Sequence, residues 1–159
     1  MCDTPVVPPL EIVAADQADR RWAAELMAGS DPWITLGRGL DRCLAACCDP
    51  EHLVFIARHN GERRGVIILQ SRGVAGSPYV VSLASALDAR GAGVGSRLLT
   101  FAETLMCREA TYLFLCVSSF NERARRFYER HGYEVVGELQ DYVIAGASEL
   151  LMCKRLSAE

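Results

Sequence analysis

The sequence predicts a single α/β domain in which a mixed β-sheet is flanked by helices. The 159 residues, half of them hydrophobic, are enough for one domain with its own core. Short β-rich runs alternate with amphipathic helical patterns along the chain. A strand-like run over residues 79–87 ends at a glycine-rich turn that leads directly into a helical pattern. We therefore expect one domain over residues 1–159, built as a sheet with helices packed on it.

The N-terminal third predicts one strand and two helices. Residues 10–15 show the short alternation of a strand. Asp16 follows as the N-cap of an amphipathic helix that Gly29 ends. After a turn at Asp31, a second helical pattern runs from about residue 39 to residue 48. The two helices should form a helical hairpin.

The middle of the chain predicts three strands that follow one another. Residues 52–58 and 63–70 are β-rich, and an Asn-Gly pair at 60–61 between them indicates a tight β-hairpin. Residues 71–78 are polar and contain glycines, which predicts a loop. The third strand, over residues 79–87, ends at the glycine-rich turn.

The C-terminal part predicts a helix, a strand, a second helix and two final strands. Apolar residues recur at helical spacing over 94–108, and residues 111–117 form the continuous apolar run of a strand buried on both faces. A capped helix over 118–132 is closed by its final glycine. The strands over 133–139 and 149–156 complete the sheet.

Charge and hydropathy exclude two classes of partner. The net charge of -3 gives no basic field for binding a phosphate backbone, so we expect no nucleic acid partner. The longest apolar runs are far shorter than the roughly 20 residues that span a bilayer, so we expect no membrane partner. Residues 1–13 hold an acid at Asp3 and three prolines but no basic segment before an apolar stretch. They do not resemble a secretion signal, and we expect a cytoplasmic protein.

The cysteines favour a reduced compartment. Seven cysteines are an odd number, and they are scattered along the chain, unlike a disulfide framework. Cys43, Cys47 and His52 fall near one another and could hold a metal ion, but they lack a paired Cys-x-x-Cys spacing. We therefore expect a helix face packed with thiols and no metal site.

The glycine-rich turn at residues 89–96 predicts an anion site. A strand that ends in such a turn and continues as a helix presents free backbone N–H groups and the positive end of the helix dipole. Glycines without a Cβ let the backbone approach an anion as bulky as a pyrophosphate. The alternative is that the glycines only make a tight turn. The residues expected to bind the anion are Arg90, Gly91, Ala92, Gly93, Val94, Gly95 and Ser96.

Two common phosphate-binding motifs do not fit this turn. A Walker loop requires Gly-Lys-Ser/Thr after the glycines, and none follows. A dinucleotide fingerprint requires a final glycine where this chain has Ser96, and the next strand ends without the acid that would hold a ribose. A nicotinamide oxidoreductase is therefore disfavoured, and the ligand should carry a pyrophosphate without needing that acid.

Two motifs resemble the GCN5-related N-acetyltransferase (GNAT) family. Arg90, Gly93 and Gly95 look like the family's Arg/Gln-x-x-Gly-x-Gly/Ala loop, which binds the pyrophosphate of acetyl-CoA. A second signature is matched in spacing by Asn121, Ala124, Phe127, Tyr128, Gly132 and Tyr133. The order of elements also agrees with the family. The resemblance implies a GNAT-like fold of mostly antiparallel N-terminal strands with a parallel pair at the cofactor cleft.

The resemblance also implies an activity and roles for residues. The protein would transfer an acetyl group from acetyl-CoA to a primary amine of a small molecule or a protein. Tyr128 would be the catalytic acid for the CoA sulfur, or else a core aromatic residue. Asn121 would touch the pantetheine or position the tyrosine, or serve as an N-cap. The backbone of Ala84 and Ser85 would bind the pantetheine, although Leu87 stands where many relatives have proline.

The general base and the acceptor remain open at this stage. Many relatives place a glutamate on the strand over residues 79–87, but this strand holds no acid. A non-catalytic CoA-binding module with the same fold is therefore an alternative. The net charge mildly suits a cationic acceptor without deciding its class. A homodimer is possible, with the apolar run at 149–153 contributing to it or packing in the core. The candidates for the base are Glu149, Asp41, His52, Glu25 or water alone, and those for an acceptor pocket are Trp22, Trp33 and Tyr142.

Overall fold

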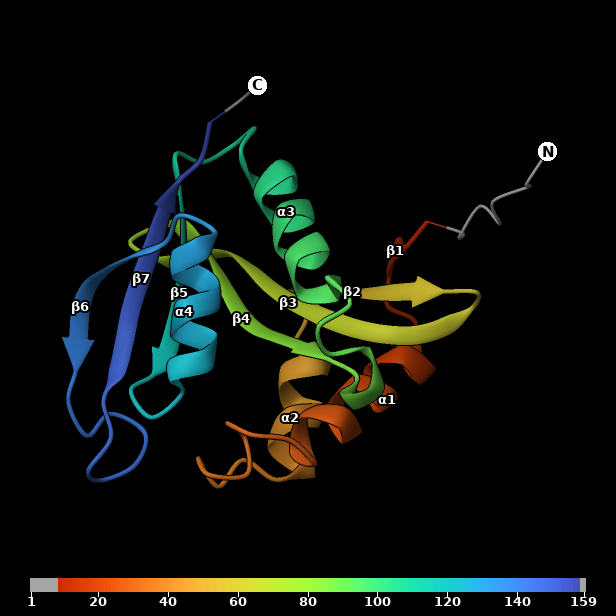
Figure 1. Ribbon diagram of the computed structural model, residues 1–159, viewed down its shortest axis with the longest axis horizontal. Helices are drawn as coiled ribbons and strands as arrows, with labels where there is room; N and C mark the ends of the chain where they lie inside the picture. Colours follow the sequence, from red (N-terminus) through yellow and green to blue (C-terminus); the bar gives the residue numbers. More distant parts are fainter. Residues whose placement is uncertain (1–8, 158–159) are drawn as a thin grey trace.

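The computed structural model describes residues 9–157, and a seven-stranded sheet lies at its centre (Figure 1). The strand order is β1-β2-β3-β4-β5-β7-β6. Neighbouring strands are antiparallel except β4 and β5, which are parallel. This confirms the predicted mixed sheet with one parallel pair. Residues 1–8, on which the expectation of no secretion signal largely depends, lie outside the described part of the chain.

The elements follow the predicted order. The strands are β1 (Glu11–Ala14), β2 (His52–His59), β3 (Glu62–Val74), β4 (Ser77–Ser85), β5 (Tyr112–Ser118), β6 (Glu134–Leu139) and β7 (Glu149–Arg155). The helices are α1 (Gln17–Ala28), α2 (Leu40–Cys48), α3 (Val94–Met106) and α4 (Glu122–Arg130), with a short 3-10 helix η1 (Leu87–Ala89) before the glycine-rich turn. Within residues 9–157, no helix is both long and apolar enough to cross a membrane.

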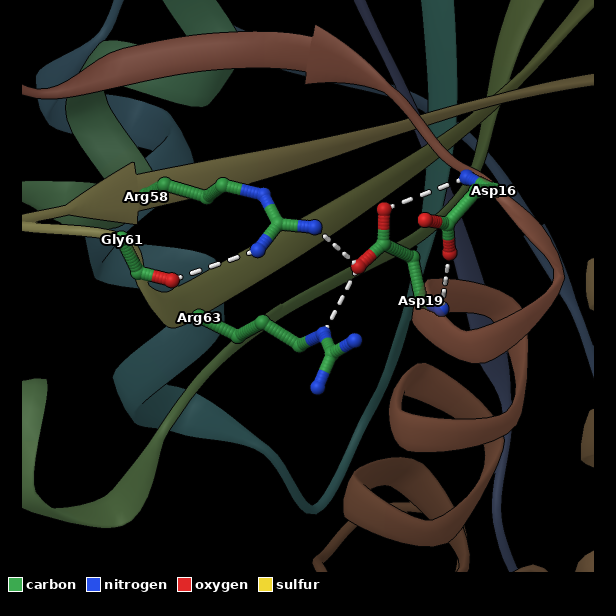
Figure 2. Close-up of polar contacts among 5 residues, drawn as sticks. All are labelled: Asp16, Asp19, Arg58, Gly61 and Arg63. Carbon is green, nitrogen blue, oxygen red and sulfur yellow. Dashed lines mark hydrogen bonds and ion pairs between the residues drawn. The ribbon is translucent and has the colours of Figure 1, made fainter.

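The N-terminus of α1 is fixed to the sheet by a buried carboxylate. Asp16 caps the helix as predicted, because its Oδ1 accepts the Asp19 N–H at 2.7 Å while Asp19 Oδ2 accepts the Asp16 N–H at 3.1 Å. Asp19 Oδ1 also accepts hydrogen bonds from Arg58 Nη2 at 2.5 Å and Arg63 Nε at 2.7 Å (Figure 2). The cluster therefore ties α1 to the β2–β3 hairpin.

The β2–β3 hairpin agrees with the prediction, but the connection between β3 and β4 does not. The predicted Asn-Gly turn is present, with φ of 50° at Asn60 and 77° at Gly61, as a tight hairpin turn requires. The predicted loop over residues 71–78 is wrong. Strand β3 runs through it to Val74, and only Ala75 and Gly76, both with positive φ, separate it from β4. Polar residues stay in the strand here because this end of β3 is mostly exposed to solvent.

Two hydrophobic cores lie on opposite faces of the sheet. Successive residues of β3 alternate between them: Ile67 and Leu69 face α3 and α4, while Val66 and Ile68 face α1 and α2. Figure 1 shows the two pairs of helices on opposite sides of the strands. Each pair of helices therefore packs on the sheet through its own set of buried side chains.

The cysteines of α2 belong to the second core. Cys43 and Cys47 are buried there, and burial raises the pKa of both thiols, that of Cys47 to about 12. His52 Nδ1 lies 2.7 Å from the Ala46 carbonyl oxygen. No three His, Cys, Asp or Glu side chains gather as a metal site within residues 9–157.

Strand β7 is an inner strand of the sheet. It pairs with β5 on one side and β6 on the other, so it offers no free edge to a second copy of the chain. Leu150 and Met152 are buried in the α3–α4 core. The apolar run at 149–153 is thus accounted for in large part by packing within the chain.

Candidate active site

A cleft of about 420 Å³ opens where β4 and β5 separate. The two strands pair only at Tyr79–Phe114 and Val80–Leu115, so the edge of β4 from Val81 to Ser85 has no partner in β5. Backbone N–H and C=O groups on such an edge are available to an extended ligand. The predicted cofactor-binding residues that line the cleft are Ala84, Ser85, Arg90, Gly91, Gly93, Val94, Gly95, Ser96, Asn121 and Tyr128; Ala92 lies in the same turn but not in the lining.

The glycine-rich turn has the geometry of an anion site. Gly91 and Gly93 have φ of 81° and 79°, and Gly93 is the N-cap of α3 with no side chain on the free N–H groups of the first turn. A Cβ added to either glycine would meet no protein atom within 4 Å, so the space in front of the turn is open. Gly95 has a different role, since its added Cβ would lie 3.4 Å from the Phe127 ring. That glycine lets α3 pack against α4 at the edge of the cleft.

Gly65 in strand β3 sets the position of this turn, and the sequence reasoning missed it. An added Cβ would lie 2.7 Å from Val94 Cγ1 and 3.0 Å from Leu98 Cδ1. The first turns of α3 therefore rest directly on the strand. A glycine inside a strand pattern is the signal that could have indicated this close approach.

Two arginines that the sequence reasoning missed add positive charge to the cleft. Arg123 and Arg130 of α4 line it together with Arg90. None of the three makes an ion pair with another side chain among the described residues. Arg123 and Arg130 are seven positions apart, which places them on one helical face, and this spacing could have been read from the sequence. The three guanidinium groups suit an anion with several phosphates.

Asn121 and Tyr128 approach the cleft from the N-cap and from the last turn of α4. The Tyr128 ring is largely buried and packs edge-to-face on Phe127 and Tyr133. Burial raises the pKa of its hydroxyl, which therefore keeps its proton at neutral pH. Asn121 caps α4, because its Oδ1 accepts the Ala124 N–H at 3.2 Å. The N-cap alternative for Asn121 is therefore correct, and its amide NH₂ remains able to donate into the cleft.

The family assignment follows from comparison with known proteins. The family described as acetyltransferase (GNAT) matches residues 17–133, from the first residue of α1 to just past the end of α4. The chain belongs to the GNAT acetyltransferase family. Tyr128 and the glycine-rich turn both fall inside the matched segment.

Individual relatives resemble this GNAT chain over part or all of its length. The 5-NmdU N-acetyltransferase of Pseudomonas phage PaMx11 is 32% identical over 85 residues, which are 54% of this chain and 59% of that protein. The matches cover 59% and 53% of two curated relatives, so this GNAT chain spans little more than half the length of the relatives that it matches.

Solved structures confirm the GNAT fold. The ribosomal-protein-S18-alanine N-acetyltransferase from Escherichia coli has a TM-score of 0.76 at 20% identity, covering 95% of this chain and 96% of that chain. An aminoglycoside 6'-N-acetyltransferase complexed with coenzyme A has a TM-score of 0.75 at 17% identity, covering 94% of this chain and 98% of that chain.

The four predicted candidates for the base of this GNAT site do not line the cleft. Glu25 is exposed and paired with Arg21, and Asp41 is exposed on the first turn of α2. Glu149 is the buried candidate, and it accepts a hydrogen bond from Ser118 Oγ at 2.6 Å. His52, described above, faces the end of α2. The Glu149 carboxylate is thus buried where the end of β5 pairs with the start of β7.

Asp31 is the one carboxylate among the described residues that line the cleft, and the sequence reasoning treated it only as a turn former. Its Oδ1 accepts hydrogen bonds from the N–H of Thr35 at 3.1 Å and from Thr35 Oγ1 at 2.6 Å. The segment that carries it also brings Trp33 to the cleft wall. The loop between α1 and α2 therefore closes the side of the GNAT cleft opposite α4.

Proposed function

We propose that the protein transfers an acetyl group from acetyl-CoA to a primary amine. The observation that carries this proposal is the cleft itself. It is lined by the free edge of β4, by the glycine-rich turn in which Gly93 caps α3, and by Tyr128. Gly91, Gly93 and the three cleft arginines fit the phosphates of the cofactor. The unpaired backbone at Ala84 and Ser85 fits the amides of the pantetheine arm.

The residues of the cleft suit each step of acetyl transfer. The amine nitrogen attacks the thioester carbonyl carbon, and a backbone N–H on the free edge of β4 stabilises the developing oxyanion. The carbon–sulfur bond then breaks, and Tyr128 donates its proton to the departing thiolate. The amine loses one proton to Asp31, to water, or through water to Glu149, which does not itself line the cleft, and Tyr128 regains a proton from solvent. Acetylated amine and free CoA are the products.

The acceptor is an amine whose class the fold alone leaves open. One structural neighbour is named for aminoglycosides and another for the alanine of ribosomal protein S18. Both small molecules and proteins are thus represented among enzymes of the same fold. The acceptor site of this chain has to be read from its own side chains.

Calorimetric titration with acetyl-CoA, and separately with NADH, tests the cofactor. Binding of acetyl-CoA without binding of NADH is the expected result, and absence of acetyl-CoA binding would overturn the proposal. A free-thiol assay with acetyl-CoA and a panel of primary amines then tests transfer. Thiol release that depends on the amine, with the acetylated product identified by mass spectrometry, is the expected outcome.

A non-catalytic CoA-binding module is a second candidate, and one observation favours it. Asp31, the one carboxylate that lines the cleft within residues 9–157, is already engaged by both donors of Thr35. Tight acetyl-CoA binding with no thiol release from any amine in the panel would favour this second function over acetyl transfer.

A further inference from the structure

A second cavity, of about 210 Å³, adjoins the cofactor cleft. Trp33 lines both, and the second cavity meets β4 at Val81 and Ser82, directly before the residues of β4 that line the cleft. A molecule in this cavity would therefore lie next to the edge of β4 along which a thioester would extend. The position is that of an acceptor-binding site.

Two arginines without carboxylate partners line this second cavity. Arg38 and Arg42 make no ion pair with any side chain within residues 9–157. Arg38 Nε is buried and has no hydrogen-bond partner in that part of the chain. The Ser82 hydroxyl, on a buried residue, adds a further hydrogen-bonding group to the wall.

A buried guanidinium donor without an acceptor is unfavourable, and an anionic ligand removes that cost. Such a donor has lost its hydrogen bonds to water and gained none in return, which destabilises the unliganded protein. A carboxylate or phosphate can accept two parallel hydrogen bonds from the planar guanidinium of Arg38, one of them from Nε. Met27 and Trp33 supply an apolar wall for the rest of a small ligand.

On the basis of the proposed acetyl transfer, we propose that the acceptor is a small amine that also carries an anionic oxygen group, a carboxylate or a phosphate. Arg38 and Arg42 bind the anionic group in the second cavity, and the amine faces the cofactor cleft. This site disfavours polycationic acceptors, because the two guanidinium groups would repel them.

Matched amines test this selectivity. One pair is an amino acid and its amide, and another is an aminoalkyl phosphate and the corresponding amino alcohol. The expected result is at least a tenfold higher kcat/KM for the anionic member of one pair, and the pair that responds distinguishes carboxylate from phosphate. The amide has the less basic amine, so intrinsic reactivity works against the expected result. Equal or faster turnover of both neutral members would overturn the inference and leave acetyl transfer intact.

Arginine variants assign the preference to this cavity. Arg38→Gln is expected to raise KM for the anionic amine by roughly 10- to 100-fold, as loss of a charge-assisted hydrogen bond predicts, and to leave the neutral amine unchanged. Arg108→Gln, which replaces an exposed arginine just after α3, is the matched control and should leave KM unchanged for both the anionic and the neutral amine. An unchanged acetyl-CoA Kd shows that the Arg38→Gln protein is folded. Equal losses for both amines would overturn the assignment.

A binding measurement separates this inference from the proposed function. If no amine releases thiol, the same anionic and neutral compounds are titrated into the CoA-loaded protein by calorimetry. Binding of an anionic member that is lost in Arg38→Gln but not in Arg108→Gln would support the anion site although transfer had failed. Absence of any difference between anionic and neutral members would overturn it.

Discussion

His131 Nε2 lies 3.0 Å from Ser96 Oγ, which joins the end of α4 to the turn that begins α3. His131 Nδ1 lies 2.7 Å from the Phe127 carbonyl oxygen, and a carbonyl can only accept, so Nδ1 carries the hydrogen. In the neutral ring, Nε2 then accepts the Ser96 hydroxyl. This contact fixes the glycine-rich turn relative to the helix that carries Tyr128.

Ser96→Ala, His131→Ala and the double variant should show that the two side chains act together. Each single variant should weaken acetyl-CoA binding by a few-fold, because the turn loses its contact with α4. In the double variant, the fold-loss of acetyl-CoA affinity should be smaller than the product of the two single-variant losses. The difference corresponds to a coupling free energy between the two side chains of about 0.5–1.5 kcal/mol. Calorimetric Kd values for the four proteins measure it. Strictly multiplicative effects would show that the hydrogen bond does not position the turn.

Tyr128→Phe should lower kcat by about 10²- to 10⁴-fold, the range for removal of a general acid, while the acetyl-CoA Kd changes little. Because burial raises the pKa of Tyr128, the wild-type acid keeps its proton as pH rises, and kcat should not fall between pH 7 and about 9.5 through loss of that proton. Steady-state rates over this pH range test both statements. Unchanged turnover in Tyr128→Phe would remove the residue from the acid role.

Gly93→Ala should weaken acetyl-CoA binding at least about tenfold, because its Cβ would enter the open space expected to hold the phosphates. Gly76→Ala is a matched control: Gly76 has φ of 81°, close to the 79° of Gly93, and its added Cβ also meets nothing within 4 Å, but it lies in the β3–β4 turn. Both variants should lose about 1–2 kcal/mol of unfolding free energy through the left-handed backbone. Equal cofactor affinity in the two would argue against the anion site.

Gly65→Ala should both destabilise the protein and weaken cofactor binding. Its Cβ would lie 2.7 Å from Val94 Cγ1 and 3.0 Å from the Ala84 carbonyl oxygen, so α3 must shift away from the sheet. Overpacking of this kind costs about 1–3 kcal/mol. Gly137→Ala in β6 is the control, since its added Cβ comes no nearer than 3.9 Å to Leu151. Chemical denaturation and acetyl-CoA titration should separate the two; identical behaviour would contradict the close packing of α3.

Asp19→Asn should lower the unfolding free energy by about 3 kcal/mol, since it leaves two arginines without their buried partner. Burial alone would raise the pKa of Asp19, but hydrogen bonds from Arg63, the Asp16 N–H and Arg58 outweigh burial and lower it. The stabilisation is therefore complete above the ordinary value of 3.8 and is lost as pH falls below it.

Denaturation of the wild type and of Asp19→Asn at several pH values tests this prediction. The difference between the two proteins should shrink as pH falls from about 5 to 2. Glu25→Gln, which breaks the exposed pair with Arg21, should cost less than about 1 kcal/mol. A constant difference across that pH range would show that Asp19 does not stabilise the fold through its charge.

Local signals made much of the fold predictable. The Asp16 cap, the Asn-Gly turn at 60–61 and the glycine turn each depend on residues within a few positions of one another. The loop predicted over residues 71–78 failed for the opposite reason. Whether a polar segment stays in a strand depends on the neighbouring strand, and β4 pairs with β3 up to the turn itself.

The parts of the site that escaped prediction depend on contacts between distant segments. Gly65 matters because α3 packs on it, and Asp31 because the loop between the two N-terminal helices folds over β4. Arg38 is informative only because its Nε is buried without a partner, which no local pattern reveals. Tyr128 and Asn121 were found because they belong to a motif with fixed spacing.

The two hydrophobic cores share the sheet, but their fully buried side chains form separate sets. Changes in α1, α2 and the loop between them therefore alter the wall around Arg38 while the α3–α4 core stays intact. In evolutionary terms, the two halves can accumulate mutations at different rates. Substitutions in α2 can therefore alter the wall around Arg38 with little effect on the core that supports the glycine-rich turn and Tyr128.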